Sequence, residues 1–278
     1  MHMHPTGQED PSTLPYRDRA GEDRSGTSAA AGPGWLTRGC ALFLDFDGTL
    51  VDLAPRPDLI EVPAHLPTLL SQLHTLLGGA LAIVSGRPMA EIDRQLHPLR
   101  ICVAGVHGAE RRFADGHVRR IPTMALDEAL VPIAALCARY PVLHIERKPG
   151  AIALHYRQAP ELEAQCLAVM EDARDRVKGV ALLRGKMVLE LKPSQATKAK
   201  AVADFMERSP FHLRRPWVFG DDVTDESAFE HVQSVGGVAV RVGAGETLAM
   251  HRLPTPASLH AWLEHNVARL ATMEGQRP

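Results

Sequence analysis

Two aspartates separated by one residue form the part of the chain most suited to chemistry. Residues 41–50 read ALFLDFDGTL, an apolar run that ends in Asp45 and Asp47 before a Gly-Thr turn. Such a run is typical of a buried parallel strand, and alternate residues of an extended segment share a face, so both carboxylates would point into one cleft. One acid could attack phosphorus while the other transfers a proton. The pattern indicates phosphoryl transfer, and the alternative is a strand end with two solvated acids.

Two later apolar runs also end at polar residues. Ser85 ends the run LAIV at 81–84, and its hydroxyl and backbone N–H could bind a phosphate oxygen before Gly86 lets the chain turn. The run at 217–219 leads into GDDVTDE, whose Asp221, Asp222 and Asp225 are hard oxygen ligands suited to Mg²⁺. A surface acidic turn would be the ordinary explanation for the last motif. All three motifs together strengthen the prediction of a phosphoryl-transfer site, because open α/β sheets place their ligands at the carboxyl ends of strands.

These motifs occur in an order that resembles the haloacid-dehalogenase-like phosphatases. That superfamily has DxDGT, a Ser or Thr that ends a strand, a Lys, and an acidic GDD-type loop. Further segments resemble the trehalose-6-phosphate phosphatases within it: GVHGAE at 105–110, ERKPGAIALHYR at 146–157, GKMVLELKP at 185–193 and GDDVTDE at 220–226. The resemblance covers roughly residues 40–263. It departs at the third motif, where the usual Lys-Gly is Lys198-Ala199, with Lys192 and Lys200 nearby.

The resemblance implies a Mg²⁺-dependent hydrolysis of trehalose 6-phosphate through an aspartyl-phosphate. Asp45 would be the nucleophile, Asp47 the acid and then the base, and Lys198 a catalytic cation that holds the phosphate with Ser85. The metal ligands would be Asp45, the main-chain carbonyl of Asp47 and Asp221. Asp225 would support the metal ligands or contact the ion through a water. Asp222 could bind the ion directly or act in the same indirect way.

The resemblance also implies which residues bind the substrate. They are Ser85, Gly86, Arg87, His107, Glu146, Lys148, Arg157 and Glu190. The basic groups would meet the phosphate, while Glu146 and Glu190 could accept hydrogen bonds from sugar hydroxyls. Glu110 would approach beside His107. Strand alternation places His155 and Arg157 on one face without deciding which face, and each charged residue could instead lie on the solvated side of a hairpin.

The spacing of apolar residues predicts an α/β protein with a Rossmann-like parallel-sheet core and an inserted smaller α/β cap. Strands and helices alternate up to about residue 111 and resume with a helix at 197–208, strands at 217 and 237–242, and a helix at 257–270. Between them we expect a helix at 126–139, a hairpin at 142–156 turning at Pro149-Gly150, a helix at 161–177 and a strand pair at 181–191. A cap would exclude water and select among phosphorylated metabolites.

These elements divide the chain into five segments. We expect a disordered segment at 1–34, the first part of the core at 35–111, the cap at 112–191, the second part of the core at 192–272 and a tail at 273–278. The first segment is rich in Pro, Gly, Ser, Thr, Asp and Arg and has no apolar stretch typical of a secretory signal.

Composition limits the partners of the protein. The 278 residues carry a net charge of −2, which argues against a nucleic-acid partner, and no run reaches the roughly 18 apolar residues of a membrane span. The four cysteines (Cys40, Cys102, Cys137 and Cys166) are widely spaced in apolar segments, which is typical of reduced core residues. We therefore expect a soluble cytoplasmic protein, with a monomer favoured and a small-molecule sugar phosphate as its partner.

Two other functions fit part of the pattern. The same site could act on another disaccharide phosphate or on a phosphorylated glycerate derivative. A sugar-phosphate sensor without turnover, or a receiver that accepts a phosphoryl group, is the non-enzymatic alternative. Asp47 argues against a receiver, because a receiver has no use for an acid that protonates a leaving group.

Overall fold

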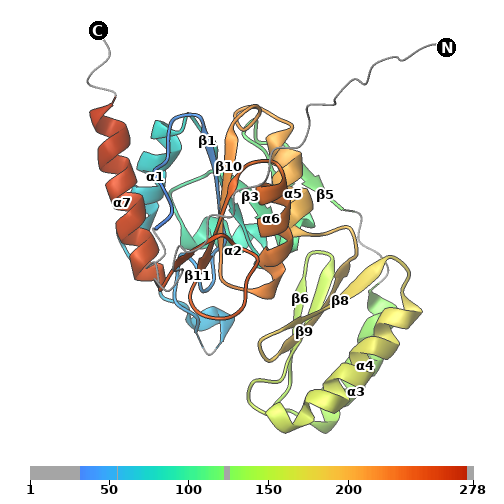
Figure 1. Cartoon of the computed structure of the whole chain (residues 1–278). Coiled ribbons are helices and arrows are strands. Elements are labelled where there is room, and N and C mark those ends of the chain that lie inside the picture. Colours follow the sequence, from blue (N-terminus) through green and yellow to red (C-terminus); the bar gives the residue numbers. More distant parts are fainter. Residues whose placement is uncertain (1–31, 55, 122–125, 274–278) are drawn as a thin grey trace, which may run out of the picture.

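The computed structural model describes residues 32–54, 56–121 and 126–273, which form a larger core and a smaller cap (Figure 1). The core contains an eight-stranded sheet in the order β12-β11-β10-β1-β2-β3-β4-β5. Its strands are β1 (Cys40–Leu44), β2 (Leu81–Val84), β3 (Cys102–Gly105), β4 (Glu110–Arg112), β5 (Val118–Arg120), β10 (Arg215–Gly220), β11 (Val238–Val242) and β12 (His251–Leu253). The six strands from β12 to β3 are parallel, and β4 and β5 are antiparallel. This is the expected Rossmann-like sheet.

Helices cover both faces of the core sheet. Helices α1 (Leu66–Leu76) and α7 (Pro256–Thr272) pack together on one side, and α5 (Lys198–Met206) and α6 (Val223–Ser234) pack together on the other (Figure 1). The short helix α2 (Met89–Gln95) connects β2 to β3. Leu66, Leu69, Leu70 and Leu73 form the buried stripe of α1, spaced as an amphipathic helix requires. Every residue of β1 is buried, as expected for a strand covered on both faces.

The hairpin of β4 and β5 was not expected from the sequence. Its strands contain arginine where a buried strand ordinarily has apolar residues. Arg111 and Arg112 are nevertheless 5% and 3% exposed, because each pairs with a carboxylate, Asp204 for Arg111 and Asp93 for Arg112. The expected start of the cap at residue 112 falls inside this core hairpin, and we propose that the cap begins after residue 120.

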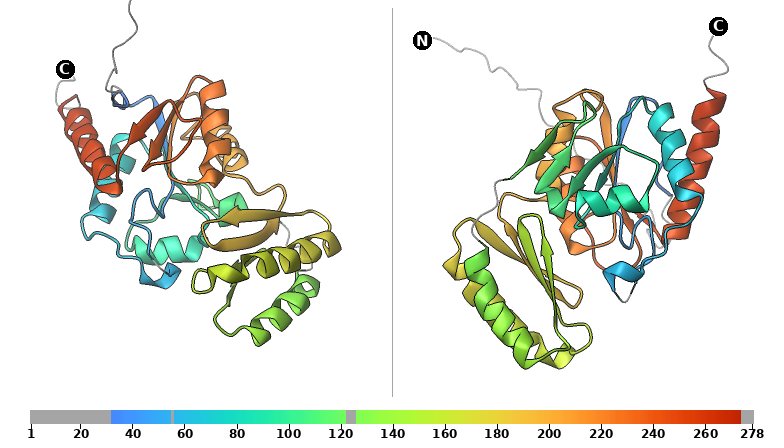
Figure 2. Two further views of the ribbon diagram at one scale, coloured as in Figure 1. Left: turned by 60° about the horizontal axis from the view of Figure 1, so that its bottom comes forward. Right: turned by 180° about the vertical axis from the view of Figure 1, so that it is seen from behind.

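The cap contains a four-stranded antiparallel sheet in the order β6-β7-β9-β8. Its strands are β6 (His144–Lys148), β7 (Ala151–His155), β8 (Val180–Gly185) and β9 (Val188–Pro193), and its helices are α3 (Asp127–Arg139) and α4 (Glu163–Arg176). Both helices lie on the side of the sheet away from the core (Figure 2). The hairpin of β6 and β7 turns at Pro149-Gly150 as expected, with Gly150 at φ +81°.

Most expected elements lie within a few residues of the observed ones. The helix expected at 161–177 is a 3₁₀ turn (Pro160–Leu162) followed by α4, and β12 was not expected. The expected disorder at 1–34 and the tail fall largely outside the described residues. Within the described part of the chain, none of the helices combines the length and hydropathy that crossing a membrane requires. The four cysteines are free, and all except Cys137 are buried.

Candidate active site

Three neighbouring strands of the core deliver acidic and hydroxyl side chains to one cavity. Asp45 follows β1, Ser85 follows β2 and Asp221 follows β10, and these strands are adjacent in the sheet. The backbone N–H of Asp45 donates to the carbonyl of Phe219 at 2.9 Å, which fixes the end of β1 beside the GDD loop. A cavity of about 610 Å³ lies between the core and the cap, and all three side chains line it.

Lys198 connects two of the acids. Its Nζ lies 2.8 Å from Oδ1 of Asp45 and 2.7 Å from Oδ1 of Asp225, and all three side chains are buried. Lys198 is the first residue of α5, where Thr197 caps the helix by accepting from the backbone N–H of Lys200. This cap directs the start of the helix, and with it the ammonium, toward the end of β1.

The neighbouring lysines do not compete for this position. Lys192 donates to the carbonyl of Ala196, and Lys200 is exposed on α5. Lys198 is therefore the lysine that reaches the aspartates. Ala199 occupies the first turn of the same helix, where alanine is a favourable residue.

The acids have the composition of a Mg²⁺ site. Asp45, Asp221 and Asp225 each offer one oxygen, and these oxygens lie within 4.8 Å of one another. Both oxygens of Asp225 are already engaged: Oδ1 pairs with Lys198, and Oδ2 accepts from the backbone N–H groups of Asp221 and Asp222 at 3.2 and 3.1 Å. Asp45 and Asp221 are therefore better placed to hold a hard cation, and three carboxylates fit its preference for oxygen.

The electrostatics of these acids also favour a cation. Burial raises the pKa of Asp45 well above its ordinary value, although Lys198 acts in the opposite direction. Burial and the charge of Asp225 raise the pKa of Asp221 to about 6. Clustered carboxylates resist ionisation together, and a nearby dication would offset their repulsion.

The turn after β1 fits closely against this cluster. Gly48 has φ +76°, and a Cβ at this position would lie 2.1 Å from Oδ2 of Asp221. No side chain can occupy that space without moving the carboxylate. The glycine of the DFDGTL segment therefore allows the turn and the GDD loop to touch.

Asp47 is held by Arg87 in an arrangement that the sequence did not reveal. Nε of Arg87 donates to Oδ2 of Asp47 and Nη2 donates to Oδ1, both at 2.7 Å. Nη1 also reaches Glu91 at 3.2 Å, and the backbone N–H of Arg87 donates to Oγ of Ser85 at 3.1 Å. The two-pronged contact fixes Asp47 as a carboxylate at the edge of the cavity.

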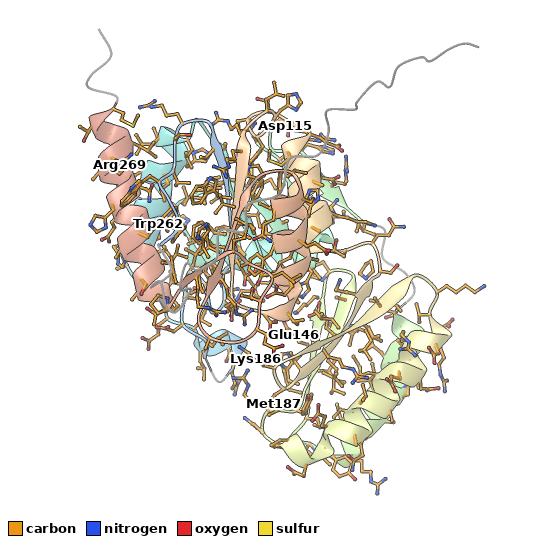
Figure 3. All side chains as sticks on the ribbon, viewed as in Figure 1. Asp115, Glu146, Lys186, Met187, Trp262 and Arg269 are labelled. Atoms are coloured by element: carbon orange, nitrogen blue, oxygen red, sulfur yellow. The ribbon has the colours of Figure 1, made fainter. Side chains whose placement is uncertain are left out.

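Charged residues of the cap complete the far wall. Lys148 pairs with Glu190 at 2.6 Å and donates across the domain boundary to the carbonyl of Gly86 at 3.3 Å. His107 of the core lies 3.5 Å from Glu190, and Glu146 bonds to His155 at 2.9 Å. Figure 3 labels Glu146, a residue of β6, where the cap meets the core.

Opposing effects determine the charges of this wall. Burial alone would raise the pKa of Glu190, but the charge of Lys148 and the hydrogen bonds from His107 and Lys148 outweigh it and bring the pKa to about 2. Burial lowers the pKa of His107, which therefore favours a neutral imidazole. The wall thus keeps Glu190 as a carboxylate where the cap meets the core.

Twelve of the residues expected from the sequence line this cavity. They are Asp45, Asp47, Ser85, Gly86, Arg87, His107, Glu146, Lys148, Arg157, Glu190, Lys198 and Asp221. Arg157 lies at its rim, where it donates to the carbonyls of Ala54 and Lys186. The expected approach of Glu110 is wrong, because its buried carboxylate accepts from the backbone N–H of Met89 at the start of α2.

Comparison with known proteins identifies relatives across most of the chain. A family model described as trehalose-phosphatase matches residues 43–253. The chain is 41% identical over 226 residues to a trehalose-6-phosphate phosphatase of Escherichia coli, covering 81% of this chain and 85% of that protein. It is 43% identical over 220 residues to a probable trehalose-phosphate phosphatase of Sinorhizobium fredii, with 78% and 80% covered.

Solved structures show the same fold. One described as a trehalose-6-phosphate phosphatase related protein is 27% identical, with a TM-score of 0.69, covering 84% of this chain and 99% of that one. A phosphatase of the haloalkanoate superfamily from Bacteroides thetaiotaomicron has a TM-score of 0.53 at 17% identity, with 81% and 94% covered, which bears on the fold alone.

Proposed function

Because this chain belongs to the trehalose-phosphatase family and is a phosphatase, we propose that it hydrolyses trehalose 6-phosphate to trehalose and phosphate. We propose that the reaction passes through an aspartyl-phosphate and requires Mg²⁺. The observation that carries the proposal is the buried contact of Lys198 with Asp45. Asp221 and Asp47, which follows Asp45 by two residues, line the same cavity.

The nucleophile in this proposal is Asp45. A carboxylate oxygen forms a bond to phosphorus while the bond from phosphorus to the sugar oxygen breaks, which divides one displacement into two easier ones. Lys198 orients Asp45 through its 2.8 Å contact and supplies positive charge next to the transferring group. Ser85 and Arg87 line the same cavity, where they can bind the phosphate oxygens.

Asp47 is the proposed proton carrier. In the described arrangement both of its oxygens accept from Arg87, so neither is directed toward a leaving group. To act, Asp47 must carry a proton and turn from the guanidinium toward the leaving sugar oxygen. The phosphate of a bound substrate can take over the guanidinium at that point. Asp47 then becomes the base that activates the water which hydrolyses the intermediate.

Mg²⁺ would be held by Asp45, Asp221 and the main-chain carbonyl of Asp47. When bound, the cation offsets the repulsion between a carboxylate and a phosphate dianion. The raised pKa values of Asp45 and Asp221 and the oxygen-rich cluster support this assignment. Asp225 contributes indirectly, by orienting Lys198 and the backbone of the GDD loop.

The cap would supply recognition of the sugar. The cavity of about 610 Å³ lies in the range of ~300–1,000 Å³ common for small-molecule sites. Glu146 and Glu190 offer carboxylate oxygens to sugar hydroxyls, and Lys148 offers a donor. A monomeric state, a cytoplasmic location and the absence of a nucleic-acid or membrane partner remain predictions from the sequence.

Phosphate release across a panel of sugar phosphates, with and without a chelator, tests the proposal. We expect trehalose 6-phosphate to give the highest kcat/KM and the chelator to abolish turnover. A higher value for another sugar phosphate would replace the substrate and retain the mechanism. Saturable binding without phosphate release from any ester would contradict the proposed reaction.

A further inference from the structure

Two carboxylates of the cavity wall share one lysine, and each also has its own imidazole. Lys148 lies 2.6 Å from Glu190 and 3.9 Å from Glu146. Glu190 is approached by His107 at 3.5 Å, and Glu146 is bonded to His155 at 2.9 Å. The five side chains form a continuous series of contacts from His155 in the cap to His107 in the core.

The register of the cap sheet places His155 against Glu146. In the antiparallel pair of β6 and β7, His144 lies opposite His155 and Glu146 lies opposite Ala153. Glu146 and His155 are therefore diagonal neighbours on one face, a spacing that long side chains span. Their side chains are 21% and 20% exposed, so the contact is largely shielded from water.

Glu146 needs His155 as a second partner, because Lys148 alone cannot satisfy the two carboxylates of Glu146 and Glu190. Burial and the charge of Glu190 both act to raise the pKa of Glu146. The hydrogen bond from His155 is the strongest opposing effect, followed by the charge of Lys148, and the pKa of Glu146 is lowered as a result. Without His155, Glu146 would depend on a lysine that lies closer to Glu190.

We propose that His155 is a positioning residue that sets the specificity of the site for sugar phosphates. It holds Glu146 as a carboxylate through Oε2. Among the described residues, Oε2 also faces Lys148, and Oε1 remains for a sugar hydroxyl. His155 therefore contributes to binding of the sugar and leaves the reaction at phosphorus unaffected. This inference rests on the proposed function, since it needs a sugar phosphate in the cavity.

Two substitutions separate positioning from packing. His155→Leu removes the donor, whereas His155→Gln retains an N–H that can reach Glu146. The control is His212→Leu, which removes an exposed imidazole of the core that does not line the cavity. Each variant is assayed with trehalose 6-phosphate and with a small aryl phosphate that contains no sugar, and its melting temperature is measured.

We expect His155→Leu to raise KM for trehalose 6-phosphate about tenfold, the loss typical of one hydrogen bond to a charged group. Its kcat/KM for the aryl phosphate should stay within about twofold of wild type, and His155→Gln should recover most of the loss. His212→Leu should resemble wild type with both substrates. Equal losses on both substrates, an unchanged KM, or no recovery with glutamine would overturn the proposal.

A double-mutant cycle covers the case in which His155→Leu is too unstable to interpret. Glu146→Gln alone and the smaller truncation His155→Ala alone should each raise KM for trehalose 6-phosphate, and His155→Ala should change KM little further in the Glu146→Gln background. Additive effects would show that the two residues act separately and would overturn the proposal.

The wild-type enzyme distinguishes this failure from failure of the proposed function. If it prefers trehalose 6-phosphate and His155→Leu keeps that preference, only the inference about His155 fails. If it prefers another sugar phosphate, the variants are assayed with that compound. If it does not prefer any sugar phosphate over the aryl ester, both proposals fail.

Discussion

The guanidinium of Arg87, which follows the neighbouring strand β2, donates to both carboxylate oxygens of Asp47 at 2.7 Å. A lysine cannot reproduce two parallel N–H contacts. We expect Arg87→Lys to lower kcat/KM for the sugar phosphate by about 10–100-fold, because the guanidinium positions Asp47 in the free enzyme and would then bind the phosphate that displaces it. Steady-state kinetics measure the loss. Arg100→Lys, at a 72% exposed side chain, is the control and should behave as wild type. Full activity in Arg87→Lys would show that the two hydrogen bonds from Arg87 to Asp47 are not needed for catalysis.

Replacing the nucleophile should stop the reaction while leaving the fold intact. Asp45→Asn preserves the shape of the side chain but removes the attacking carboxylate. Turnover should fall by ~10⁴-fold or more, as for other enzymes that lose their nucleophile. Circular dichroism and the melting temperature should stay close to wild type. Undiminished phosphate release from this variant would rule out covalent catalysis by residue 45.

Removing the buried ammonium should affect both catalysis and stability. Lys198→Met leaves Asp45 and Asp225 without their shared cation, and breaking a buried ion pair costs ~3–5 kcal/mol. We expect a loss of kcat and a lower midpoint in urea unfolding. Lys200→Met, on the exposed side of the same helix, is the matched control and should change neither. Equal stability of the two variants would show that the buried pair contributes little to folding.

Stabilisation by Mg²⁺ should depend on pH. The pKa of Asp221 is raised to about 6 and that of Asp45 is also raised, so the metal-free folded state retains protons that the unfolded state loses. The stability that these groups contribute is present below about pH 4, their ordinary range, and is lost as the pH rises through about 6.

Mg²⁺ competes with those protons, so the rise in melting temperature on adding it should be small at pH 5 and larger at pH 7. At a concentration of 100 Kd the gain is about 2.7 kcal/mol. Thermal unfolding with Mg²⁺ and with a chelator at pH 5, 6, 7 and 8 measures it, and Asp221→Asn should abolish most of the response. A response independent of pH would contradict the assignment of these acids as ligands.

A methyl group at position 48 should disrupt the metal site. In Gly48→Ala the new Cβ would lie 2.1 Å from Oδ2 of Asp221, so we expect loss of activity and of the thermal response to Mg²⁺. Gly116→Ala is the control, because Gly116 has a similar φ of +82° with no atom within 4 Å of its Cβ position. It should lose about 1 kcal/mol of stability from the left-handed backbone and keep full activity. An active Gly48→Ala enzyme would show that the turn can move away from Asp221.

The sequence was sufficient to predict the strand ends that meet at the site, because each motif directly follows an apolar run and the carboxyl ends of parallel strands share one edge. It was not sufficient to predict which side chains pair there. Asp47 and Arg87 are 40 residues apart on different strand ends, and alternation alone could not decide which face of the cap sheet carries His155.

The missed elements have a related cause. The strands β4 and β5 are too rich in arginine to show a buried pattern, and Asp204 and Asp93 neutralise those arginines only in the folded protein. Glu110 lies within a motif of the family, but its carboxylate is used at the start of α2. Local pattern therefore predicted which acids line the cavity better than it predicted their supporting contacts.

The position of β1 between β10 and β2 has a consequence for biosynthesis. On the ribosome, β1 can pair with β2 soon after residues 81–84 emerge, but its other neighbour, β10, begins only at residue 215, after the whole cap has been made. The nascent chain must keep one side of a fully apolar strand unpaired during that interval, and exposed strand edges invite association with other chains. The interval between synthesis of residues 81–84 and of residues 215–220 is thus the stage at which this edge of β1 is open to association with other chains.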